Sequence, residues 1–365
     1  MSPKDPFHLN LGHNVRAHST SGALGIFLPT HATLVHAHPS INDLGWTSRA
    51  HRKRRYRNLR FDGTDEPETA LKALARFGKL EWRELSWWVA VLFTFGSIVW
   101  VINGFIVFLP QINSEKYGQN EVGGGWTAWL GATIFEFGAV TALLEAMNRE
   151  EDIAFGTTSS HEDERPLQEP SPHLEPRKKT KRFRLIPSDP KLWLEIGFWA
   201  NFVQIWAATI FWISGWTGIP QVFESIQRRP RLEDGVYWTP QVIGGSGFVI
   251  ASLLFMLENQ KRWWRPAPLS LGWHVGLWNL VGAVGFTLCG IFGYSRFIPA
   301  DGSSNWATYQ SACSTFWGGW AFLVGSIVQW WEAVQPPRPQ KNKPTDVEAG
   351  SNGQREQGIE EKSRS

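Results

Sequence analysis

The chain has 365 residues, of which 42% are hydrophobic, and it contains 22 Trp and 23 Phe against only 5 Tyr and 2 Cys. A formal net charge of +3 is too small to indicate a nucleic-acid partner. Two cysteines cannot form the disulfide framework of a small secreted domain. Tryptophan is enriched where membrane meets water, because its ring is apolar and its N–H is polar. The composition therefore favours an integral membrane protein.

Six apolar runs of about twenty residues predict membrane-spanning helices, since such a run crosses the roughly 30 Å hydrocarbon layer at 1.5 Å per residue. The runs cover residues 87–109, 126–145, 196–219, 239–258, 273–294 and 309–332. We expect Pro110 and Pro220 to end the first and third helices, and Pro240 to lie in the first turn of the fourth. The expected fold class is an all-α membrane protein, a six-transmembrane-helix bundle.

Residues 1–48 show no periodicity and are rich in His, Ser, Gly and Pro, which predicts a disordered tail. His31, His36 and His38 lie close together and suggest a metal site as an alternative. No Cys or acidic side chains accompany these histidines, however, so disorder is the favoured interpretation and no metal or cofactor is expected.

Residues 49–85 combine a basic cluster with an amphipathic pattern, which predicts a helix lying in the membrane interface with its cations near anionic lipid headgroups. An ordinary solvated helix is the alternative. The basic residues expected at headgroups, including those of the loop between the second and third runs, are Arg52, Lys53, Arg54, Arg55, Lys72, Arg76, Lys79, Arg83, Lys178, Lys179, Lys181 and Arg182.

The distribution of Lys and Arg among the connections predicts that both termini are cytoplasmic, because cytoplasmic loops carry the excess of these residues. The basic connections precede the first run, separate the second from the third and link the fourth to the fifth. The predicted organisation is a disordered tail (1–48), a basic segment with an interfacial helix (49–85), three helical hairpins (86–147, 192–260 and 272–335), a cytoplasmic polar loop (148–191) and a disordered tail (336–365).

The three hairpins share a pattern that suggests duplication of a two-helix unit. Each first helix is rich in aromatic residues and is followed by proline, and each second helix ends at an acid, Glu145, Glu258 or Glu332. The segments FGSIVWVINGF and FLVGSIVQWWE resemble hairpins of uncharacterised multi-pass integral membrane proteins of filamentous fungi and, more faintly, the YrhK-type two-helix membrane domain. This resemblance implies a membrane protein and carries no activity with it.

Glu136 lies in the middle of the second run, where an acid costs at least about 2.5 kcal/mol. It is interpreted either as a proton or cation site or as a hydrogen-bonded acid that joins two helices. Its candidate neighbours at spanning depth are Asn103, Asn201, Gln204 and Asn279.

The three acids at helix ends meet the negative end of the helix dipole and need cationic partners. Arg83, Arg149, Lys191 and Lys261 are the candidates, and a ring of acids guarding an entrance is the alternative.

No catalytic motif is found, so an enzyme is not expected. The favoured function is a non-enzymatic membrane scaffold or sensor attached to anionic lipid, and the alternative is a small-solute or ion carrier or channel that uses Glu136. Packing of the bundle by aromatic residues favours the first class, and a polar cavity that reaches Glu136 favours the second. Cys289 and Cys313 are expected at matching depth, either as buried packing residues or as a disulfide.

Overall fold

The computed structural model describes residues 15–36, 44–53, 74–118, 120–148, 183–297 and 305–335. Six of its helices are long and apolar enough to cross a membrane, which confirms the six predicted spans. They are α3 (Leu85–Ile112), α5 (Glu121–Met147), α6 (Ile196–Thr217), α9 (Thr239–Glu258), α10 (Leu271–Gly293) and α11 (Trp306–Val334).

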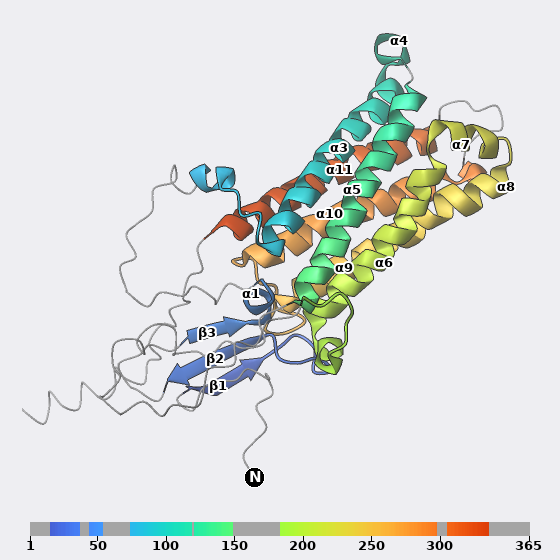
Figure 1. Cartoon of the computed structure of the whole chain (residues 1–365). Coiled ribbons are helices and arrows are strands. Elements are labelled where there is room, and N and C mark those ends of the chain that lie inside the picture. Colours follow the sequence, from blue (N-terminus) through green and yellow to red (C-terminus); the bar gives the residue numbers. More distant parts are fainter. Residues whose placement is uncertain are drawn as a thin grey trace, which may run out of the picture.

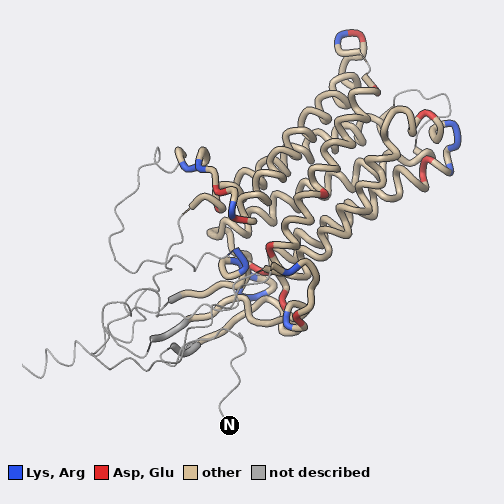
Figure 2. The backbone as a smooth tube through the Cα atoms, in the orientation of Figure 1, with Lys and Arg blue, Asp and Glu red and all other residues tan. Residues whose placement is uncertain are grey.

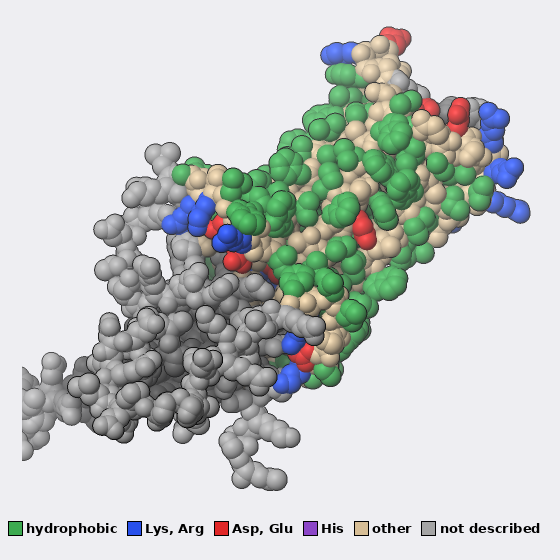
Figure 3. Space-filling view, in the orientation of Figure 1, with side chains coloured by type: hydrophobic (Ala, Val, Ile, Leu, Met, Phe, Trp, Pro, Cys, Tyr) green, Lys and Arg blue, Asp and Glu red, His purple; other side chains and the backbone are tan. Residues whose placement is uncertain are grey.

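The six helices form a closed ring in chain order. Each packs against its neighbours in the sequence, and α11 packs back against α3 (Figure 1). Charged residues gather mainly at the two ends of this bundle, while hydrophobic side chains cover much of the face seen in Figure 3 (Figures 2 and 3). The outward faces of the six helices therefore match the hydrocarbon of a bilayer.

The two ends of the bundle differ in what covers them (Figure 1). At one end, here called the loop end, lie the short helices α4 (Ser114–Tyr117), α7 (Pro220–Ile226) and α8 (Pro230–Glu233). At the other end, here called the docking end, lie α1 (Ser48–Arg52) and a three-stranded sheet. The first and last described segments of the chain both lie at the docking end, as an even number of spans requires.

One proline position differs from expectation. Pro110 lies inside α3, which continues to Ile112. Proline has no N–H and so removes one backbone hydrogen bond, but the N–H of Asn113 donates to the carbonyl of Leu109 at 3.1 Å and continues the helical pattern past it. Pro240 lies in the first turn of α9, as predicted. The span as a whole begins earlier, since α8 and a π-helical turn (Asp234–Trp238) lead directly into α9. A π turn relaxes the hydrogen-bond pattern at the point where the N–H of Pro240 is missing. Pro220 starts α7 after α6 has ended, as predicted.

The prediction of a disordered tail over residues 1–48 is wrong for three segments. Strands β1 (Val15–Ser21), β2 (His31–His36) and β3 (Leu44–Thr47) form an antiparallel sheet in that order. The loop between β1 and β2 is joined to the 3₁₀ turn before α6 (Pro190–Leu194) by a hydrogen bond from the backbone N–H of Leu28 to the carbonyl of Leu194, 2.8 Å. Pairing between strands that are separated in the sequence orders these polar segments, and periodicity within one segment does not report such pairing. His38 lies outside the described residues.

The predicted interfacial helix is described only from residue 74. Within that part, residues 74–75 are helical and lead into a 3₁₀ turn (Arg76–Gly78). A hydrogen-bonded turn at residues 82–83, with the N–H of Glu84 donating to the carbonyl of Glu81 at 2.8 Å, then precedes α3, so Lys79 and Arg83 do not continue one helical stripe with Arg76. Phe77 packs on the rings of Trp330 and Trp331, at centroid distances of 5.9 and 5.4 Å. The described part is thus held by aromatic contacts with α11.

Candidate functional site

Three buried cations and three carboxylates meet at the docking end. The cations are Arg49, Arg52 and Lys53, from α1 and the residue after it. The carboxylates are Glu145, Glu258 and Glu332, from the C-terminal ends of α5, α9 and α11. We call these six residues the charged cluster. Its formal charges are equal in number, so the N-terminal segment neutralises acids from three separate helices.

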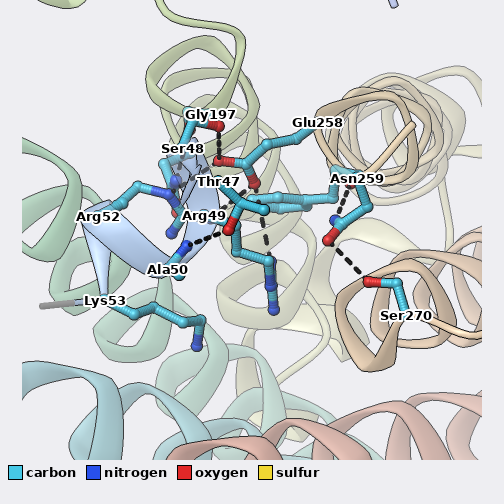
Figure 4. A network of polar contacts seen from close by, with 12 residues as sticks. Thr47, Ser48, Arg49, Ala50, Arg52, Lys53, Gly197, Glu258, Asn259 and Ser270 are labelled. Carbon is cyan, nitrogen blue, oxygen red and sulfur yellow. Dashed lines mark hydrogen bonds and ion pairs between the residues drawn. The ribbon is translucent and has the colours of Figure 1, made fainter. Parts of the chain in front are cut away.

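Arg52 lies between two of the acids. Its Nη1 is 2.9 Å from Glu145 Oε2, and its Nη2 is 2.8 Å from Glu258 Oε2, while Nε donates to Glu258 Oε1 at 3.3 Å. Arg49 makes a two-bond contact with Glu332, at 2.9 and 2.7 Å. The Nη1 of Arg49 also lies 3.8 Å from Glu258 (Figure 4). Lys53 Nζ lies 3.5 Å from Glu332. Bidentate arginine–carboxylate contacts of this kind fix orientation as well as charge.

The electrostatics of the cluster differ among the three cations. Burial by itself disfavours the charged guanidinium groups of Arg49 and Arg52, but the neighbouring carboxylates outweigh it and raise the pKa of both above the ordinary value. Burial instead lowers the pKa of Lys53, although Glu332 and Glu145 oppose the shift. Both arginines therefore stay charged, and Lys53 is the cation that loses its proton most readily.

The first helices of the three hairpins make room for the cluster with small residues. A Cβ added to Gly197, at the start of α6, would overlap Glu258 Oε1 and lie 3.1 Å from Arg52 Nε. A Cβ added to Gly272, at the start of α10, would overlap Arg49. The corresponding residue of α3 is Ser86, whose hydroxyl donates to Glu145 Oε1. These positions leave space for the two guanidinium groups.

The cluster corrects two expectations. The helix-end acids meet the cations of the N-terminal segment in the charged cluster, and Arg83, Lys191 and Lys261 do not occupy that place. The carboxylates of the three helix-end acids converge, as the alternative of an acidic ring requires, but they surround cations instead of an open entrance. Arg149 lies outside the described residues.

The headgroup interpretation is wrong for Arg52 and Lys53, because both are buried within the protein. Among the other residues expected at headgroups, Arg76, Lys79 and Arg83 are described and lie at the surface or partly exposed. Lys79 pairs with Glu81 at 2.8 Å with 66% of its side chain exposed, and Arg83 covers the ring of Trp82. The remaining ones, Arg54, Arg55, Lys72, Lys178, Lys179, Lys181 and Arg182, lie outside the described residues.

A layer of six aromatic side chains, one from each spanning helix, closes the middle of the bundle. Its members are Trp100, Phe135, Phe211, Phe248, Phe286 and Phe322. Each is in ring contact with at least one other member; for example, Trp100 and Phe286 lie 4.6 Å apart between ring centroids, and Phe286 and Phe322 lie 5.1 Å apart. We call this set the aromatic layer. It was not predicted as a set, although three of its members, Phe135, Phe248 and Phe322, each precede a helix-end acid by ten residues in the sequence.

Polar side chains lie on both sides of the aromatic layer. Toward the docking end, Gln204, Asn279 and Gln329 line a cavity of about 20 Å³ that also touches the charged cluster, and Asn201 lines it as well. Toward the loop end, a larger cavity of about 420 Å³ reaches from the surface to Trp100 and Phe211. We call it the loop-end cavity. A third cavity, of about 350 Å³, lies beside Arg52 between the sheet and α6.

The four predicted neighbours of Glu136 are placed elsewhere. Asn201, Gln204 and Asn279 line the small cavity beneath the charged cluster, and Asn103 donates to the carbonyl of Gly124 at 2.7 Å on the other side of the aromatic layer.

Glu136 itself is half-buried, and its Oε1 accepts a 2.9 Å hydrogen bond from Thr209 of α6. None of the three cavities has Glu136 in its described lining. This geometry joins α5 to α6.

The two cysteines are free thiols, so the disulfide alternative is not realised. Cys289 is buried on the floor of the loop-end cavity, where Gln241 Nε2 donates to its sulfur at 3.0 Å and Thr315 Oγ1 at 2.9 Å. Within the described part of the chain, no group of three His, Cys, Asp or Glu side chains is arranged to hold a metal ion.

The geometry defines a class of protein, a multi-pass membrane protein of six helices whose docking end is occupied by its own N-terminal segment. No family model, curated protein or solved structure matches the chain. The resemblance to fungal integral membrane proteins and to the YrhK-type hairpin remains a prediction.

Proposed function

We propose that this protein is a non-enzymatic membrane sensor or scaffold. The aromatic layer carries the proposal, because it separates the loop-end cavity from the small polar cavity and the charged cluster. A bundle filled by interlocking rings resists passage of water or ions, while it still transmits displacement from one end to the other, since packed cores are not continuously deformable. The docked N-terminal segment would then respond to the state of the helices that bind it.

The proposed orientation places the docking end in the cytoplasm. The basic connections join the spans at that end, which agrees with the excess of Lys and Arg in cytoplasmic loops. Lys79 and Arg83 are exposed at that end, where anionic headgroups would lie. Accessibility of a cysteine introduced at Lys79, measured in sealed vesicles of known orientation, tests this placement, and labelling from the non-cytoplasmic face contradicts it.

We also propose that the bundle arose by triplication of a hairpin. Trp100, Phe211 and Phe286 each follow fourteen residues after Ser86, Gly197 and Gly272, and Phe135, Phe248 and Phe322 each precede a helix-end acid by ten residues. A further equivalence lies at the start of the first helices: the ring nitrogens of Trp88, Trp199 and His274 each lie within 2.9 Å of the carbonyl six residues earlier. Such agreement in both spacing and contacts supports descent from one unit.

Flux measurements test the proposed function. Proteoliposomes with the wild-type protein should pass protons and potassium no faster than protein-free liposomes of the same lipid, and Glu136→Gln should leave that result unchanged. A flux that depends on Glu136 would instead establish the carrier or channel alternative. One observation favours a path for that alternative that does not pass Glu136. Residues from most or all of the six helices contribute to the loop-end cavity, to the aromatic layer and to the small polar cavity, so these three features lie along the middle of the ring.

A flux that appears only in Trp100→Ala would fit a barrier formed by the aromatic layer. If the wild type shows a flux, and if Asn279→Leu abolishes it by filling the small cavity, the path runs along the bundle axis and the sensor proposal is overturned.

A further inference from the structure

We propose that the loop-end cavity is a binding site for a small organic cation, a protonated amine with an aromatic or other apolar body. The proposal deepens the proposed function, since it supplies the ligand class that a sensor would detect. It rests on the size of the cavity, on its charge, on an aromatic wall and on a floor that carries hydroxyl groups.

The size and position of the cavity suit a small molecule from water. Its volume of about 420 Å³ lies within the range of roughly 300 to 1,000 Å³ that is usual for ligand pockets. Asn120 and Glu121, both exposed at the start of α5, line its mouth, and Trp100 and Phe211 of the aromatic layer lie at its inner end. A ligand that enters from the loop end would therefore contact the layer that separates it from the docking end.

The charge of the lining favours a cation. Glu121 is the single charged side chain among the described residues that line the cavity. The described basic residues of the same end, Lys116, Arg228, Arg229, Arg231 and Arg296, lie outside this lining. A carboxylate at the mouth attracts cations and repels anions, and the apolar walls focus its field into the cavity. An anionic ligand would have no cationic lining residue to pair with.

One wall of the cavity is aromatic. Phe223, Tyr237 and Trp238 form a continuous series, with ring centroids 5.0 Å apart for the first pair and 4.4 Å apart for the second. Aromatic faces attract ammonium groups within about 6 Å, and their area also favours an apolar body. Glu233 accepts a hydrogen bond from Trp238 at 2.9 Å and so helps to hold that end of the series in place.

The floor of the cavity carries hydroxyl groups. The hydroxyl of Thr315 lies within bonding distance of both the Cys289 sulfur and the carbonyl of Ser311, and the hydroxyl of Ser311 lies near both the sulfur and the carbonyl of Cys289. Each hydroxyl donates one proton and has two oxygen lone pairs, so it can also accept a hydrogen bond. The N–H groups of an ammonium could donate to these oxygens.

Calorimetry with three ligands of similar shape tests the charge preference. The full-length protein is placed in nanodiscs of zwitterionic phosphatidylcholine at pH 7, and benzylamine, benzyl alcohol and phenylacetate are titrated as cation, neutral molecule and anion. Benzylamine is expected to bind at least about tenfold more tightly than benzyl alcohol, which corresponds to about 1.4 kcal/mol. Phenylacetate should bind more weakly than both. Equal affinity of the three ligands, or tighter binding of phenylacetate, overturns the proposal.

Matched variants place the binding in the cavity. Glu121→Gln should weaken benzylamine binding roughly fivefold, whereas Glu115→Gln, an acid of α4 that does not line the cavity, should leave it unchanged. Thr315→Val keeps the shape of the side chain and removes the floor hydroxyl, so binding should weaken; Thr287→Val removes a hydroxyl that bonds only within α10 and should have no effect. If Glu121→Gln and Thr315→Val both bind benzylamine as the wild type does, the site is not this cavity.

Hydrogen exchange separates this proposal from the proposed function. Exchange of the amides of residues 44–53 is measured with and without saturating benzylamine. A change in exchange supports a sensor that couples the two ends of the bundle. Binding with unchanged exchange leaves the amine site standing and refutes the coupling, while absence of binding refutes the site.

Discussion

Arg52→Met should release the N-terminal segment from the bundle while the six helices remain folded. Arg52 is the shared cation of Glu145 and Glu258, and the exposed fractions of the Arg52 and Glu258 side chains are 5% and 1%. Removing one partner of such a buried pair costs about 3–5 kcal/mol, since a buried charge is left without compensation. Because 1.4 kcal/mol is a factor of ten, the undocked population should increase by roughly two to three and a half orders of magnitude.

Hydrogen exchange of residues 44–53 measures that population. In the docked state, the N–H of Ser48 donates to the carbonyl of Thr30 at 2.8 Å and the N–H of Lys53 donates to the carbonyl of Arg49 at 3.0 Å. Their exchange should accelerate by a factor of about 10² to 4 × 10³ in Arg52→Met if exchange follows the undocking equilibrium. Lys79→Met is the matched control, because it removes a cation from an exposed ion pair that contributes less than about 1 kcal/mol.

A mutant cycle checks that the effect arises from the pair itself. Arg52→Met combined with Glu258→Gln should be less harmful than the sum of the single changes, with a coupling energy within the 0.5–3 kcal/mol found for contacting residues. Exchange that stays within threefold of wild type in Arg52→Met, or effects that add without coupling, would refute the role assigned to the charged cluster.

Three further predictions concern other parts of the docking end and the bundle. Burial, with a contribution from Lys261, lowers the pKa of His31 from 6.5 to about 4, so the folded state binds this proton less readily than the unfolded state does. The stability that neutral His31 contributes at pH 7 is therefore lost as the pH falls from about 6.5 towards 4. His31→Gln should reduce the acid-induced rise in hydrogen exchange of β2. Trp100→Ala leaves a cavity in the aromatic layer and should cost about 3–5 kcal/mol in a thermal or denaturant unfolding assay; a loss below 1 kcal/mol would show that the layer is not tightly packed. Gly197→Ala should undock the segment by displacing Glu258, whereas Gly78→Ala, where an added Cβ meets no atom within 4 Å, should not change exchange at residues 44–53.

Part of the candidate site was visible in the sequence. The helix-end acids were identified from their position after apolar runs, and the need for cationic partners followed from the helix dipole. The partners themselves were not identified, since Arg52 is separated from Glu258 by 206 residues and lies in a segment without helical or strand periodicity. The equal spacing of the aromatic residues from the acids was a usable signal for the aromatic layer, because equal spacing on repeated helices places side chains at equal depth.

The six spans could be predicted from local sequence, because the free energy of placing a helix in hydrocarbon depends mainly on the length and composition of that helix alone. Which surfaces are covered by protein depends on how the distant parts of the chain pack together. Arg52 and Lys53 have the composition of a headgroup-binding segment, yet three carboxylates from distant helices converge on this segment and bury it. Pairing of charges over such distances depends on where the whole chain places them, and no local pattern contains that information.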